Sequence, residues 1–242
     1  MSRLFVVFLL SVVIPSAHAL TFYTESNPPM NFTANGKVSG WATDVVVEVA
    51  KRAGLAPEIV LGQWDDGYAR ARDQADTCIF SAVRRPERFK LFQWVGPLGR
   101  SRYSAFALEA FSQKLTRVDD LKAFRIGVVD DARAAYLRQR GFPNIVLSYS
   151  DETIPGRLTL DPARADGVDL WVTGAAGAKM VSGAQGVKAI KEVFPDILSQ
   201  DYWLACSREL PRETVRAFSA ALSEMRKDGT LRKMSEPPKP AN

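Results

Sequence analysis

Three arginines lie close together in the segment FSAVRRPERFKLF, residues 80–92. Arg84, Arg85 and Arg88 surround Pro86, which fits the first turn of a short helix. A planar guanidinium at a helix start can bind a carboxylate through two parallel hydrogen bonds. The segment therefore predicts an anion clamp, with Arg88 as the clamp and Arg84 as a second contact. A solvated basic surface explains the same residues equally well at this point.

Other polar and aromatic residues follow the carboxyl ends of expected strands. In an open parallel sheet these ends meet the starts of the next helices in a crevice, where free backbone amides favour anions. Each residue type also has a structural explanation, because tryptophan packs in cores, aspartate caps helices and glycine forms turns. The binding candidates at these positions are Glu25, Asn27, Trp64, Asp130, Asp131, Arg133, Thr173 and Gly174.

Those strand ends come from a repeated order of strands and helices. Short apolar runs predict strands, and apolar residues at helical spacing predict helices, with Thr43 as one N-cap and Asp130 or Asp131 as another. This order is typical of an α/β fold, with two units in series, each a mostly parallel sheet flanked by helices. The strands are expected at 20–25, 56–62, 76–82, 124–129, 144–149 and 167–174, and the helices at 43–54, 64–74, 130–141 and 211–229.

The first residues, 1–19, have the pattern of a secretory signal peptide, with one arginine, an apolar run and the small-residue site Ala17-His18-Ala19. The apolar run is too short for a transmembrane helix, which needs about 20 residues. We therefore expect cleavage after Ala19 and a periplasmic protein. The formal net charge of +5 is only mildly basic and is spread along the chain, which argues against a nucleic-acid partner.

The chain has a single histidine, His18, and it leaves with the signal peptide. Nucleophiles that need a histidine base and zinc sites that use histidine are therefore excluded, whereas carboxylate, lysine or tyrosine chemistry remains possible. We predict no catalytic residue, no metal site and no cofactor. Cys78 and Cys206 lie in apolar runs, and we favour two buried thiols over a disulfide.

The ordered motifs YTESNPPMNF, GWATDVVVEVAKRAG, QWDDGYARA, RRPERFKLFQWVGPL, DDLKAFRIGVV and LSEMRKDGTLRKM resemble the family 3 periplasmic solute-binding proteins, the polar amino-acid receptors of ABC importers. The resemblance covers almost all of the mature chain. It implies a two-lobed clamshell with a hinge of two strands, near 101–108 and 201–207. Residues 20–105 with 205–242 would form lobe 1 and 106–204 lobe 2.

The resemblance also implies a function and a set of partners. The protein would capture a small polar solute, an amino acid or a related carboxylate, as its lobes close. Its partners would be that solute and, transiently, a membrane ABC permease, and it would be a monomer. Two alternatives stay open: a dehydratase-like enzyme on the same scaffold, with Glu25 as the base, and a sensory receptor that signals to a membrane protein.

The family's binding residues fall on particular positions of this chain. The arginine that grips the substrate carboxylate falls on Arg88 and the aromatic wall on Trp64. The polar strand end falls on Ser81, Ala82 and Val83, and the helix start of the second lobe on Asp130 to Arg133.

The chain departs from the family pattern at several of these places. Gly174 stands where an aspartate usually pairs with the ligand ammonium, and Asn27 stands where an aromatic residue is usual. Val83 and Arg85 occupy places where a hydroxyl residue is common. These changes favour an anion over a zwitterion unless Glu25, Asp130 or Asp131 supplies the missing carboxylate.

Overall fold

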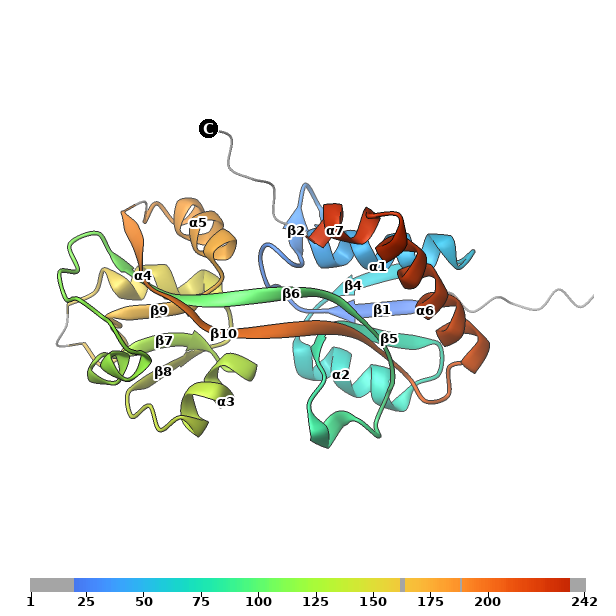
Figure 1. The fold of residues 1–242 in the computed structure, drawn as a ribbon, viewed down its shortest axis with the longest axis horizontal. Helices are drawn as coiled ribbons and strands as arrows, with labels where there is room; N and C mark the ends of the chain where they lie inside the picture. The colour runs from blue at the N-terminus through green and yellow to red at the C-terminus, as the bar shows by residue number, and fades with distance from the viewer. Residues whose placement is uncertain (1–19, 162–163, 188, 236–242) are drawn as a thin grey trace, which may run out of the picture.

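The computed structural model describes residues 20–161, 164–187 and 189–235, and these form two lobes joined by two long strands (Figure 1). The predicted signal peptide, 1–19, and the end of the chain, 236–242, lie outside the described residues. The eight-stranded sheet that runs through both lobes has the order β4-β1-β5-β10-β6-β9-β7-β8. The predicted α/β fold with two lobes is confirmed.

Lobe 1 has a parallel core of three strands. Apolar side chains alternate along them, so Phe22 of β1 packs against Phe218 of α6 on one face, while Ile79 of β5 points toward α2 on the other. A hairpin of β2 (Phe32–Ala34) and β3 (Lys37–Ser39) stands beside this core. The main elements are β1 (Thr21–Thr24), β4 (Glu58–Leu61), β5 (Thr77–Val83), α1 (Trp41–Arg52), α2 (Trp64–Asp73), α6 (Arg212–Lys227) and α7 (Thr230–Ser235).

Lobe 2 repeats this arrangement on a smaller scale. Its three strands are parallel to one another, with one helix on one face of the sheet and two on the other. Three short 3-10 turns complete the described elements: η1 (Pro86–Arg88) in lobe 1 and η2 (Val118–Ala123) and η3 (Asp151–Thr153) in lobe 2. The main elements are β7 (Ile126–Val129), β8 (Ile145–Ser148), β9 (Leu170–Thr173), α3 (Ala132–Gln139), α4 (Ile154–Leu158) and α5 (Ala175–Ala184).

Two strands carry the chain between the lobes. β6 (Gln93–Leu108) runs outward and β10 (Ile190–Cys206) returns antiparallel to it (Figure 1). β10 also pairs with β5 in lobe 1, and β6 pairs with β9 in lobe 2, so the two strands join the lobes into one continuous sheet. The predicted lobe boundaries fall at the lobe 2 end of β6 and the lobe 1 end of β10, and we retain them as a proposed division.

The start of α1 differs from the predicted one. Thr43 is not the N-cap, because the helix begins at Trp41 after Gly40, whose φ is 121°. The amides of Trp41 and Ala42 donate to the carbonyls of Pro29 and Met30, so a loop distant in sequence caps this helix. A side chain at Gly40 would collide with the same carbonyls, which explains why glycine stands there.

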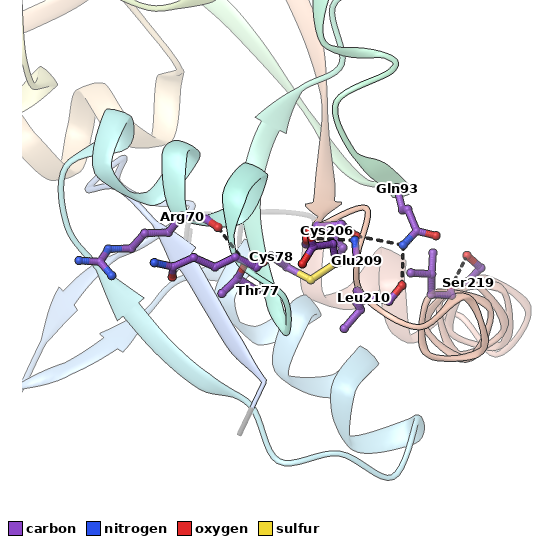
Figure 2. The surroundings of a disulfide bond; sticks show 11 residues. Arg70, Thr77, Cys78, Gln93, Cys206, Glu209, Leu210 and Ser219 are labelled. Carbon is purple, nitrogen blue, oxygen red and sulfur yellow. Dashed lines mark hydrogen bonds between the residues drawn. A yellow bond between two sulfur atoms is a disulfide. The ribbon is translucent and has the colours of Figure 1, made fainter. Parts of the chain in front are cut away.

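The two cysteines form a disulfide, so the expectation of two thiols was wrong (Figure 2). Cys78 on β5 lies directly opposite Cys206 on β10, and both are fully buried. The apolar surroundings were foreseen, but the pairing depends on how β10 returns beside β5. The side-chain amide of Gln93 donates to the carbonyls of Ser207 and Leu210 next to the bond, at 2.9 and 2.7 Å.

Candidate functional site

A cavity of about 470 Å³ lies between the lobes. Its volume is within the range of small-molecule sites. Lobe 1 lines the cavity with residues at the ends of β1 and β5 and at the start of α2. Lobe 2 lines it with residues at the ends of β7 and β8 and in α3, and the connecting strand β10 adds Gln200 and Tyr202. The lining residues are Glu25, Asn27, Gln63, Trp64, Asp65, Ser81, Val83, Arg85, Arg88, Val129, Asp130, Asp131, Ala132, Ala135, Arg138, Ser148, Tyr149, Gln200 and Tyr202.

Arg88 lies at the end of η1 and reaches into this cavity. Its guanidinium carbon lies 5.1 Å from the centre of the Tyr68 ring and 5.6 Å from that of Trp64, so aromatic faces hold the charge in place. Within the described part of the chain, no carboxylate forms an ion pair with it. Burial and then the charge of Arg85 lower the pKa of Arg88. This half-buried cation is therefore open to an anionic ligand.

The side chains of Arg84 and Arg85 lie in different surroundings. Arg85 lines the cavity, whereas Arg84 is exposed outside the lining and stacks on Phe89, Trp94 and Trp203. Side chains of successive residues at a strand end point to opposite sides, which separates these neighbours. Arg84, which was predicted as the second contact, therefore does not line the cavity. Arg85, which stands where relatives carry a hydroxyl residue and was expected to be as readily solvated, does line it.

Glu25 follows β1 and faces the cavity from lobe 1. Burial raises its pKa to about 7, with repulsion from Asp131 as the next cause and smaller contributions from Asp151 and Asp65; the charge of Arg133 opposes them. A cationic partner would stabilise the charged form of this buried and repelled carboxyl group, and would therefore lower its pKa again.

Arg133, one of the predicted binding residues, is buried and does not line the cavity. Its side chain is 1% exposed and forms ion pairs with Asp131 at 2.8 Å and with Asp151 at 2.7 Å. Asp131 also caps α3 by accepting the amide of Arg133, and Asp151 accepts the indole N–H of Trp171 at 2.8 Å. Burial alone would lower the pKa of Arg133, but the two carboxylates hold it well above its usual value. In the ion-paired triad Asp131–Arg133–Asp151, only Asp131 lines the cavity, and the other two residues hold it in position from the protein interior.

The remaining candidates divide into those that line the cavity and those that do not. Asn27, Ser81, Val83 and Asp130 line it, and the Ser81 hydroxyl donates to the Asn31 side chain at 2.5 Å. Ala82 and Thr173 are buried elsewhere in the sheet, and Gly174 precedes α5 without lining the cavity. The structure therefore brings together Glu25, Asn27, Trp64, Ser81, Val83, Arg88, Asp130 and Asp131.

Several lining residues were not foreseen. Gln63 and Asp65 flank Trp64 in sequence, so their position at the strand end was a usable signal. Gln200 and Tyr202 come from the returning strand β10, where no local pattern marks them. The Tyr202 hydroxyl forms a buried hydrogen bond with the hydroxyl of Tyr103 on β6, which fixes the two connecting strands together under the cavity.

Two kinds of feature, metal-binding clusters and membrane-spanning helices, are absent from the described residues. Across residues 20–161, 164–187 and 189–235, no group of three or more histidine, cysteine, aspartate or glutamate side chains is placed to hold a metal ion. Within the same ranges, no helix is both long and apolar enough to cross a membrane.

Residues 20–237 match the model of a single protein family, described as bacterial extracellular solute-binding proteins, family 3. The chain belongs to this family. A curated relative, the L-cystine-binding protein TcyJ of Escherichia coli (strain K12), is 25% identical over 227 residues, which cover 86% of this chain and 77% of the relative.

Solved structures of other proteins have a similar fold. A histidine kinase sensor domain described as similar to periplasmic binding proteins superposes with a TM-score of 0.75 at 20% identity, covering 89% of this chain and 93% of that one. ArtJ of Geobacillus stearothermophilus, an arginine-, lysine-, histidine-binding protein, gives a TM-score of 0.73 at 19% identity over 90% and 93% of the two chains. At these identities the likeness shows the fold.

In this family 3 protein the loop after β1 contacts lobe 2 directly. The Ser26 hydroxyl donates to Glu152 of η3 at 3.1 Å. A β-carbon added at Gly177, in the first turn of α5, would lie 2.8 Å from the carbonyl oxygen of Pro28, which is closer than such atoms approach. The structure therefore shows the lobes in contact, and the absence of a side chain at Gly177 permits that contact.

Proposed function

We propose that this protein binds an α-amino acid, or a close relative that carries both a carboxylate and a cationic group, between its lobes. The observation that supports this most is the Arg88 guanidinium, which two aromatic rings hold in the cavity without a carboxylate partner among the described residues. A ligand carboxylate at Arg88 would provide the missing charge with bidentate geometry. The lobes would close over it, as in other two-domain receptors.

Side chains of opposite charge line the cavity, which supports a dipolar ligand. Arg85 and Arg88 belong to the segment after β5, whereas Glu25 follows β1 and Asp131 precedes α3, and the charge of Asp131 acts on Glu25. Gly174 supplies no carboxylate, so Glu25 and Asp131 would take the ligand's cationic group instead. This arrangement favours a zwitterion over a simple anion, contrary to one reading of the sequence.

The names of the relatives point to the same ligand class. The Escherichia coli relative is named for L-cystine, and ArtJ is described as binding arginine, lysine and histidine. We propose that the ligand here is also an amino acid, that the protein works in the periplasm after removal of its signal peptide, and that it delivers the ligand to an ABC permease as a monomer. We propose no catalytic activity, and turnover of any ligand by the protein would contradict this.

Removal of the guanidinium of Arg88 tests the proposal. We expect Arg88→Ala to weaken binding of the preferred amino acid by about 30-fold or more, because truncating one partner of a buried charge pair costs about 2–5 kcal/mol. The ligand is found by thermal shift with the common amino acids, L-cystine and dicarboxylates, since saturation at 100 times the dissociation constant stabilises by about 2.7 kcal/mol. Calorimetry then measures affinity.

Arg84→Ala is the matched control for this measurement. It removes a guanidinium four residues away that stacks on aromatic rings outside the cavity. We expect its affinity to stay within about threefold of the unchanged protein, because an exposed side chain remote from the ligand contributes little. Equal losses in both variants would contradict a specific clamp at Arg88.

A second prediction concerns the contact between the lobes. We expect Gly177→Ala to weaken ligand binding by about tenfold, because its methyl group would press on the Pro28 carbonyl only when the lobes close, and overpacking typically costs about 1–3 kcal/mol. Gly183→Ala adds the same group to the same helix where no atom lies within 4 Å, and should bind normally. Calorimetry measures both. Normal affinity in Gly177→Ala would show that closure does not need this contact.

A further inference from the structure

The carboxyl group of Glu25 lines the cavity without a partner. Within the described residues, no hydrogen bond or ion pair reaches its side chain, although its backbone carbonyl accepts from the side-chain amide of Asn31. A carboxylate that is withdrawn from water without a donor or a cation is costly, and protonation removes that cost. With the lobes in contact, as in this structure, the position of Glu25 therefore favours the neutral form while the cavity is empty.

The charged neighbours of Glu25 act in the same direction. Asp131 at the start of α3, Asp151 in η3 and Asp65 at the start of α2 repel a negative charge there, with Asp131 as the strongest of the three. Arg133 is the cation with the largest influence on Glu25, and its guanidinium is already bound to both Asp131 and Asp151. Burial and this repulsion together raise the pKa of Glu25 to about 7.

We infer that Glu25 carries a proton in the empty cavity and releases it when the cationic group of the ligand settles beside it. The O–H bond of the carboxyl group breaks, the proton passes to solvent, and the carboxylate formed pairs with the ligand's ammonium or guanidinium. This inference rests on the proposed function, because it needs a ligand with a cationic group. It makes Glu25 the residue that selects for that group and links capture of the ligand to pH.

The sign of the pH dependence follows from the direction of proton flow. Below neutral pH the proton must be removed before the pair can form, so affinity falls as pH falls. If the proton is fully lost in the complex, the dissociation constant should rise by roughly 25-fold from pH 7.5 to pH 5.5. About half a proton should be released per ligand bound at pH 7.

Two measurements test the inference. The first follows the side-chain carbon of Glu25 by NMR in the ligand-free protein, assigned by its loss in Glu25→Gln, and we expect a midpoint near pH 7. The second measures binding enthalpy at pH 7 in phosphate and in Tris, whose ionisation enthalpies differ, with L-arginine, L-cystine and the best amino acid from the thermal-shift screen. We expect release of about half a proton by the unchanged protein.

Two variants complete the test. Glu25→Gln keeps the shape but cannot release a proton, so binding should be weaker, independent of buffer and nearly independent of pH. Glu58→Gln changes an exposed glutamate on β4, outside the cavity, and should retain proton release and pH dependence. A titration midpoint near the ordinary value of about 4.3, or binding without proton release, would overturn the inference.

The proposed function and this inference fail in different ways. Binding by none of the amino acids would refute the proposed function, and the inference with it. Tight binding of an amino acid that is abolished in Arg88→Ala but unchanged in Glu25→Gln would keep the proposed function and refute the inference alone.

Discussion

Arg133→Ala is expected to lower the free energy of unfolding by about 3–5 kcal/mol, because it leaves two neighbouring carboxylates without their cation. Asp151 is 3% exposed, so its charge would remain in a buried site with the indole N–H of Trp171 as its hydrogen-bond donor. The guanidinium also stacks on the ring of Tyr103, with 5.1 Å between its carbon and the ring centre, so packing against β6 is lost too. Urea unfolding followed by far-UV circular dichroism measures the change.

Arg138→Ala serves as the control for this experiment. Arg138 lies on the same helix and pairs with Asp130 at 3.0 Å, but both side chains are about half exposed. Exposed ion pairs contribute about 0–1 kcal/mol, so this variant should unfold at nearly the same urea concentration as the unchanged protein. Similar small losses in both variants would show that the triad Asp131–Arg133–Asp151 adds little to stability.

Removal of the disulfide should have an effect of similar size. We expect the double variant Cys78→Ala with Cys206→Ala to lose about 4–5 kcal/mol of unfolding free energy, the chain-entropy value for a closed loop of this length. The two residues are 128 positions apart, and both lie in the fully buried part of lobe 1. Unfolding of the double variant and of the oxidised protein in urea gives the difference.

Thiol chemistry provides the control for that comparison. The oxidised protein unfolded without reductant should show no free thiol by mass spectrometry after alkylation, whereas a reduced sample should show two. The unchanged protein measured in reductant should then unfold like the double variant. If its stability is the same with and without reductant, the bond does not stabilise the fold.

Sequence patterns were sufficient for most elements of the fold. Short apolar runs predicted β1, β4, β5, β7, β8 and β9, of which β5, β7 and β9 are buried on both faces, and apolar residues at helical spacing predicted α1, α2, α3 and α6. The start of α1 was missed because carbonyls of Pro29 and Met30, rather than a local side chain, bind its first amides. α5 was not predicted, since its small residues give a weak apolar pattern.

The site was less accessible to prediction than the fold. Glu25, Trp64 and Arg88 stand in loops or helix starts that follow strands, and this position, together with the family resemblance for Trp64 and Arg88, led to the cavity. The choice between Arg84 and Arg85 depends on side-chain direction after β5, which sequence spacing does not define. Pairing of Cys78 with Cys206 required the register of β10 beside β5, a contact between distant parts of the chain.

The path of β10 also determines the order in which the two lobes can be completed as the chain folds. Lobe 2 comes from a continuous segment, but lobe 1 needs α6, α7 and the end of β10, all from the last part of the chain. Cys78 and Cys206 are 128 positions apart, so β5 has an open edge and Cys78 has no partner until the end of the chain has returned to lobe 1. Lobe 1 is therefore exposed to edge-to-edge aggregation and to bonding with a foreign thiol for longer than lobe 2.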